Sequence, residues 1–106
     1  MDLERLRQLL AKRRVSLRIS DHALIEARND GLTTDDLEAT LLGGIAVEDY
    51  GARALVLAFT EDDRLPCHVV LEYLPGMREV TIVTAYVPDS REWRPDWKTR
   101  KGRRER

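Results

Sequence analysis

Imidazole titrates near neutral pH, so the two histidines are the residues of this chain best suited to acid–base chemistry. His22 follows Ser20 and Asp21, which together predict the first turn of a helix. A helix start presents unpaired backbone N–H groups and a partial positive charge, which attract an anion and oppose protonation of a nearby imidazole. His22 is therefore a candidate general base or acid for phosphate chemistry. The same residues are also typical of an ordinary capped helix with a surface histidine.

The second histidine, His68, lies in a predicted strand. With a two-residue period it shares a face with Val70 and Glu72, opposite an apolar face that includes Cys67 and Val69. The apolar face is the better candidate for the core. We therefore expect His68 to point to solvent or into a groove, where either a surface role or a catalytic role is open to it.

The hydroxyls of Thr84 and Tyr86 are the remaining candidates for chemistry. Both lie in the last predicted strand, on the face that the two-residue period assigns to Val80 and Ile82. A neutral histidine, these hydroxyls and an arginine would suffice to deprotonate a ribose 2′-OH and stabilise a phosphorane without a metal. The spacing alone does not bring them together, and both residue types are common in strands with no such role.

Other chemistries lack their sequence signatures. Two histidines and one cysteine, dozens of residues apart, match no zinc spacing, and the paired aspartates do not form a calcium loop. There is no glycine-rich phosphate loop and no nucleophile elbow. We expect no metal or cofactor, and we expect Cys67, which lies in an apolar run, to be a buried reduced thiol.

Length and composition bound the class of protein. The chain has 106 residues, of which 42% are hydrophobic and 35% charged, which is typical of one globular domain under a charged surface. We place the domain at residues 1–97 and a basic tail at residues 98–106. No apolar segment approaches the roughly 20 residues that span a bilayer, and the N-terminus lacks the apolar core of a signal peptide. A cytoplasmic protein with no membrane partner is the expectation.

Charge is divided unevenly along the chain. Residues 91–106 carry a net charge of +5, whereas the remaining residues carry −6. A basic segment on an acidic body indicates either phosphate contacts or a solvated, solubilising tail. Trp93 and Trp97, among these cations, would either stack on bases or, as we favour, fold back and anchor on the domain. The candidate RNA-binding cations are Arg28, Lys98, Arg100, Lys101, Arg103 and Arg104, and a second basic cluster comprises 12–14 and Arg18.

Helical spacing of apolar residues predicts helices over residues 2–13, 20–29 and 33–43. Alternating and apolar runs after Gly44 predict strands over 45–50, 54–59, 67–73 and 80–87, and residues 15–19 fit either a short strand or an extended connector. Short turns between successive strands imply antiparallel neighbours. The expected fold class is α+β, with N-terminal helices packed on one face of a four-stranded, mainly antiparallel sheet.

The order of several short motifs resembles the small bacterial family called domain of unknown function 4258, over about residues 15–98. The motifs are Ser20-x-His22-Ala23, Gly31-Leu32-Thr33, Glu48-Asp49-Tyr50, His68-Val69-Val70, Thr84-Ala85-Tyr86-Val87-Pro88-Asp89 and Trp93.

The resemblance implies a RelE-like fold and the role of toxin in a bacterial type II toxin–antitoxin pair, beside a zinc-finger antitoxin. It implies a metal-independent endoribonuclease with His22, His68, Thr84 and Tyr86 as catalytic residues. One position departs from the family pattern: Asp30 stands where the family carries an arginine before the helix-ending glycine, and Arg28 would project differently. Two alternatives are a non-catalytic domain that binds nucleic acid or a protein partner, and an adaptor with no site.

Overall fold

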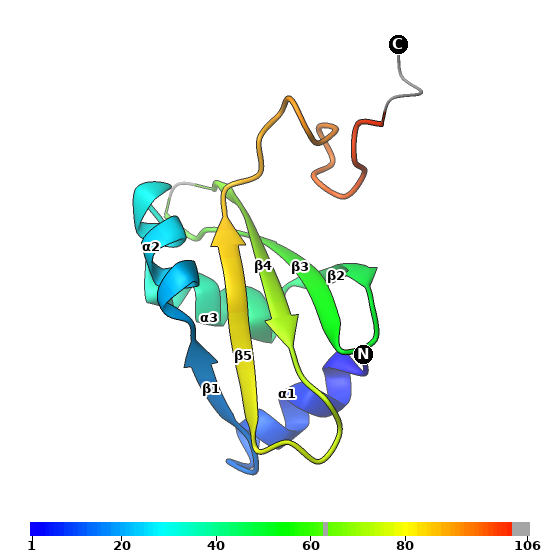
Figure 1. The fold of residues 1–106 in the computed structure, drawn as a ribbon. Helices are drawn as coiled ribbons and strands as arrows, with labels where there is room; N and C mark the ends of the chain where they lie inside the picture. The colour runs from blue at the N-terminus through cyan, green and yellow to red at the C-terminus, as the bar shows by residue number, and fades with distance from the viewer. Residues whose placement is uncertain (63, 103–106) are drawn as a thin grey trace.

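The computed structural model describes residues 1–62 and 64–102 and has an α+β fold, in which three helices and a five-stranded mixed sheet are described (Figure 1). In chain order the elements are α1 (Leu3–Ala11), β1 (Ser16–Ile19), α2 (Asp21–Asn29), α3 (Thr34–Gly43), β2 (Ile45–Asp49), β3 (Arg53–Phe59), β4 (Pro66–Glu72) and β5 (Glu79–Tyr86). No helix in these two ranges has both the length and the apolar character needed to cross a membrane.

The sheet has the order β1-β5-β4-β3-β2. The pairs from β2 to β5 are antiparallel, as the short turns predicted, whereas β1 pairs in parallel with β5. The expected count of four strands was therefore wrong. Residues 16–19 form a fifth strand because they pair with β5, which lies more than 60 residues later in the chain.

The helix boundaries follow from local capping. Ser20 Oγ accepts a hydrogen bond from the backbone N–H of Ala23, and Thr33 and Asp36 form a reciprocal capping box. The first helix ends at Ala11, two residues before the expected end, and Arg13 then adopts a left-handed φ of 59° in the turn that leads to β1.

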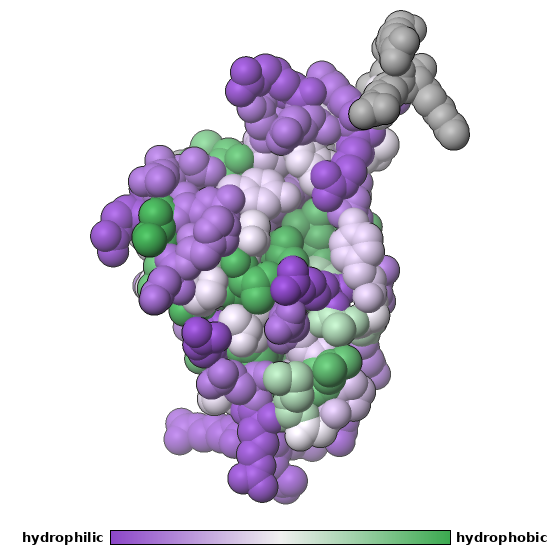
Figure 2. All heavy atoms as spheres, in the orientation of Figure 1, coloured by the Kyte–Doolittle hydropathy of each residue, from purple (hydrophilic) through white to green (hydrophobic). Residues whose placement is uncertain are grey.

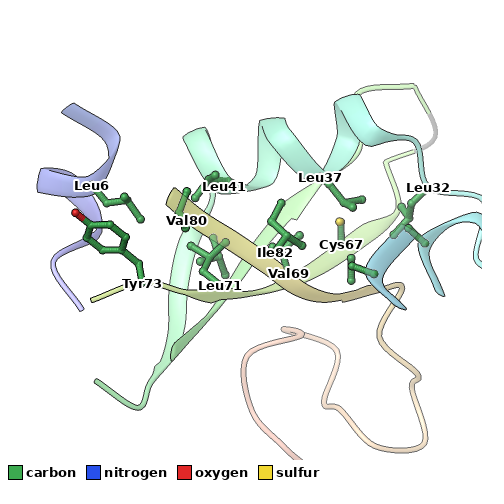
Figure 3. Close-up of a cluster of buried hydrophobic side chains, with 14 of the residues drawn as sticks. Leu6, Leu32, Leu37, Leu41, Cys67, Val69, Leu71, Tyr73, Val80 and Ile82 are labelled. Atoms are coloured by element: carbon green, nitrogen blue, oxygen red, sulfur yellow. The ribbon is translucent and has the colours of Figure 1, made fainter. Parts of the chain in front are cut away.

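The main core lies between the helices and one face of the sheet (Figure 3). Leu37 and Leu41 of α3 point onto Val69 and Leu71 of β4, and all four side chains are buried. Cys67 belongs to the same cluster and is fully buried, as expected. This layer fixes the position of β4 and β5, which carry the candidate site residues on their other face.

A β-bulge in β5 overturns one expectation about those residues. Thr84 pairs with Val70 and Tyr86 with His68, whereas Ile82 pairs with Leu71, so the register shifts by one residue near Val83. Ile82 therefore faces the main core, and Thr84 and Tyr86 face the opposite side of the sheet.

The C-terminal segment, residues 87–102, lies on that opposite side, away from α1 and α3 (Figure 3). Trp93 is only 2% exposed and is anchored on the sheet, as we favoured. The segment is tied to itself by backbone hydrogen bonds between Arg94 and Thr99 and between Lys101 and Glu92. The sheet is thus covered on both faces near His68.

Two adjacent glycines at the end of α3 should respond in opposite ways to alanine. A Cβ at Gly44 would lie 2.6 Å from the carbonyl oxygens of Leu57 and Thr40, which belong to backbone that cannot move cheaply. A Cβ at Gly43 would meet no atom within 4 Å. We expect Gly44→Ala to lower the free energy of unfolding by about 2–3 kcal/mol. Gly43→Ala should leave it unchanged or raise it by up to ~1 kcal/mol. Urea unfolding of the two variants makes the comparison, and equal stabilities would contradict the close approach of α3 to β3.

Candidate functional site

Helix α2 lies along the edge of β5 that β1 leaves open. Because β1 ends at Ile19, the polar backbone groups of β5 beyond Ile82 have no strand partner on this side. Three side chains around α2 take the place of that partner. The bonds run from Ser20 Oγ to the carbonyl of Val83 (3.2 Å), from the N–H of Ala85 to Glu26 Oε1 (3.1 Å) and from the N–H of Val87 to Asp30 Oδ2 (2.8 Å).

This arrangement gives Asp30 a specific role. Its carboxylate joins the end of α2 to the residue that follows β5, which an arginine at the same position could not do, because a guanidinium only donates hydrogen bonds. The residue that departs from the resembled family pattern is therefore part of the α2–β5 contact in this chain.

His22 occupies the first turn of α2, and 71% of its side chain is exposed. Its Nε2 lies 3.5 Å from Glu26 Oε1, the oxygen that also accepts the N–H of Ala85. The carboxylate is therefore held on the backbone of β5 and is placed to orient the imidazole. His22 is open to solvent on its remaining sides.

His68 is fully buried, which corrects the expectation that it points to solvent or into a groove. Its Nε2 lies 2.7 Å from the carbonyl oxygen of Trp97, and its Nδ1 lies 3.3 Å from the Tyr86 hydroxyl. A carbonyl only accepts, so Nε2 carries the proton and Nδ1 accepts from Tyr86. The rings of Trp93 and Tyr86 pack edge-on, with centroids 4.5 Å and 5.3 Å from the imidazole.

Burial sets the protonation state of this pair. Desolvation lowers the pKa of His68 and is opposed by the hydrogen bond to Trp97, while the positive charge of Arg100 lowers it further. Desolvation also raises the pKa of Tyr86 to about 12. At neutral pH both groups are uncharged, which is what their shared hydrogen bond requires.

An ion pair closes the C-terminal segment over His68. Two nitrogens of Arg100 donate to the two oxygens of Glu48 at 2.8 and 2.9 Å, and the guanidinium lies 4.5 Å from the Trp93 ring centroid. The hydrogen bond from Arg100 lowers the pKa of Glu48, and the Tyr50 hydroxyl donates to the same carboxylate. Sequence reasoning missed the pairing of these two residues, because 52 residues separate them.

The structure thus separates the predicted catalytic residues into two groups. His68 and Tyr86 meet in a buried pair, with Thr84 half-buried on the same face. His22 lies apart on α2 and is linked to β5 through Glu26. Of the predicted RNA-binding cations, Arg28, Lys98 and Lys101 are exposed, Arg100 is paired with Glu48, and Arg103 and Arg104 lie outside the described residues.

The buried imidazole predicts a pH dependence of stability. The pKa of His68 in the folded protein is lowered below the 6.5 of a free imidazole, so the unfolded chain takes up a proton first as the pH falls. The stability that His68 contributes is fully present above pH 6.5 and is lost as the pH falls toward the folded pKa. The slope is at most about 1.4 kcal/mol per pH unit.

Urea unfolding of the wild type and of His68→Gln between neutral and mildly acidic pH measures this contribution. The difference in unfolding free energy between the two proteins should shrink as the pH falls. Glu48 titrates at lower pH, because its pKa is lowered from 4.5, and it is common to both proteins. A difference that stays constant across the range would contradict a neutral, buried His68.

Comparisons with known proteins identify the family. Residues 19–91 match the model of the family described as Domain of unknown function (DUF4258). No curated protein and no solved structure matches the chain. Because the match spans more than half of the chain, the protein belongs to the DUF4258 family.

Proposed function

We propose that this DUF4258 protein is a metal-independent endoribonuclease, acting as the RelE-like toxin of a bacterial type II toxin–antitoxin pair, with His22 as its general base. The observation that carries the proposal is the exposure of His22 in the first turn of α2, beside the fixed carboxylate of Glu26. Of the two histidines in the chain, His22 is the one that a substrate can reach.

The proposed reaction uses the groups around His22. His22 Nε2 lies 3.5 Å from Glu26 Oε1, so in the proposed reaction Nε2 faces the carboxylate and Nδ1 acts as the basic nitrogen. Nδ1 takes the proton of a ribose 2′-OH, the 2′-oxygen bonds to the adjacent phosphorus, and the bond to the 5′-oxygen breaks. The departing oxygen takes a proton from solvent water. The products are a 2′,3′-cyclic phosphate and a 5′-hydroxyl end.

Contacts to the scissile phosphate would come from two sources. Backbone N–H groups at the start of α2 favour an anion. The exposed cations Arg28, Lys98 and Lys101 are available for flanking phosphates. In this proposal His68 and Tyr86 position β4, β5 and the C-terminal segment, and they do not touch RNA.

A second function is favoured by the charges around His22. Asp21, Glu26 and Asp30 all lie on or at the end of α2, and carboxylates repel phosphate. This acidic helix favours the alternative in which the domain binds nucleic acid or a protein partner elsewhere on its surface without cleaving RNA.

An RNA-cleavage assay separates the two functions. The purified protein is incubated with structured RNA in the presence of EDTA, and the new ends are analysed. The ribonuclease proposal expects 2′,3′-cyclic phosphate and 5′-hydroxyl ends, together with growth arrest when expression is induced in bacteria. Intact RNA and normal growth would leave the binding function and reject the toxin.

A further inference from the structure

A pocket lies at the end of the sheet opposite His22 and His68. It has a volume of about 890 Å³ and is formed by α1, the turn that follows it and the connection between β4 and β5. These elements meet at the lower end of the molecule in Figure 1. Four arginines line it: Arg5, Arg13, Arg14 and Arg78.

Within the described part of the chain, these four arginines have no acidic partner, in contrast to three others. Arg53, Arg91 and Arg100 each form an ion pair with a carboxylate. Within residues 1–62 and 64–102, no ion pair or side-chain hydrogen bond engages the four pocket guanidiniums, although the chain holds 19 acidic residues. The one carboxylate in the lining, Asp2, caps α1 by accepting the backbone N–H of Arg5.

The other part of the lining is apolar. Leu6, Val15 and Tyr73 form a buried floor, and Met77, which is 42% exposed, stands at the rim with Pro75. Figure 2 shows hydrophilic side chains gathered at this lower end of the molecule, next to an apolar patch. The pocket therefore combines unpaired cations with apolar surface.

The cationic side of the pocket is held by a fixed turn. Arg13 has a φ of 59°, in the left-handed region, and its N–H donates to the carbonyl of Leu10. The next amide, of Arg14, donates to the carbonyl of Leu9. The backbone that carries the guanidiniums of Arg13 and Arg14 is therefore ordered before any ligand binds. This order reduces the entropy cost of binding.

We propose that this pocket binds an acidic segment of a partner protein, with carboxylates on the arginines and an apolar side chain on the floor. Arginine is suited to bidentate contacts with carboxylates, and the positive charges of the four guanidiniums are complementary to the negative charges of an acidic segment. RNA fits less well, because the one aromatic ring in the lining, Tyr73, is 8% exposed and offers no face on which a base can stack. This inference does not depend on the ribonuclease proposal, because the pocket shares no residue with α2.

Binding of labelled model peptides tests the proposal by fluorescence anisotropy. The probe is a peptide of alternating leucine and glutamate pairs, and the matched probe replaces every glutamate with lysine. We expect the acidic peptide to bind, the basic peptide not to bind, and the affinity to fall as the salt concentration rises. The double variant Arg5→Ala/Arg78→Ala should bind the acidic peptide at least about tenfold more weakly.

The control variant is Arg64→Ala, because Arg64 lies in the connection between β3 and β4, at the other end of the sheet, and should not change the affinity. Thermal unfolding confirms that the variants are folded. Equal binding of both peptides, or an unchanged affinity of the double variant, would overturn the proposal. Displacement of the peptide from the wild type by single-stranded RNA would also overturn it, since nucleic acid would then be the occupant. The same holds if the free wild-type chain is a dimer and the double variant is a monomer, since a second copy of the chain would then be the occupant.

Discussion

Replacing His22 with alanine is expected to lower the rate of RNA cleavage by about 10²–10⁴-fold, because the proposed reaction loses its general base. The same change should alter the free energy of unfolding by no more than about 0.5 kcal/mol, since 71% of the His22 side chain is exposed. Initial rates on a labelled RNA, measured beside urea unfolding of both proteins, check the two expectations together.

Glu26→Gln is a second, milder variant that tests the group beside His22. The glutamine oxygen can still accept the N–H of Ala85, so the α2–β5 contact is kept while the negative charge beside His22 is lost. Cleavage should fall about tenfold, because the orienting charge is absent. If His22→Ala cleaves RNA and arrests growth as well as the wild type does, His22 is not the base and the proposed mechanism is wrong.

The elements whose signals are local could be predicted from the sequence. Ser20 and Thr33 cap the helices that they were expected to cap, because each cap depends on residues three positions away. The strands from β2 to β5 are consecutive and joined by short turns, so their antiparallel pairing follows from turn chemistry. The position of His22 in the first turn of α2 has the same local origin.

Two features of the sheet could not be predicted because they are not local. The pairing of β1 with β5 joins segments separated by most of the chain, and a run of four residues carries no signal of its partner. The sequence also gives no sign of the bulge near Val83, since an uninterrupted alternation is the simplest interpretation of residues 80–87. One extra residue moved Thr84 and Tyr86 to the face that His68 occupies.

The burial of His68 has a similar cause. The alternation along β4 correctly placed it opposite the main core, and solvent or a groove was the expected environment on that side. The ring is buried because Trp93 returns across the sheet and because the carbonyl of Trp97 meets Nε2. The tryptophans were expected to anchor on the domain, but nothing in their spacing identifies His68 as the residue on which they anchor.

Replacing Trp93 with alanine is expected to lower the free energy of unfolding by about 3–5 kcal/mol. The indole is 2% exposed, packs edge-on to His68 and supports the guanidinium of Arg100. Its removal leaves a cavity above a buried, neutral imidazole and takes away the surface on which the Glu48–Arg100 pair is built. Urea unfolding followed by far-ultraviolet circular dichroism measures the loss.

Trp97→Ala is the matched control, because Trp97 is only half-buried and contacts His68 through its backbone carbonyl, which alanine retains. Its cost should be no more than about 1–2 kcal/mol, although alanine must also keep the left-handed φ of 60°. Limited proteolysis adds a local readout, since loss of the Trp93 anchor should expose residues 87–102 to cleavage before the sheet unfolds. Equal stability and equal proteolytic resistance of the two variants would show that Trp93 does not hold the C-terminal segment in place. The ion pair between Glu48 and Arg100 would then be the interaction that keeps the segment over His68.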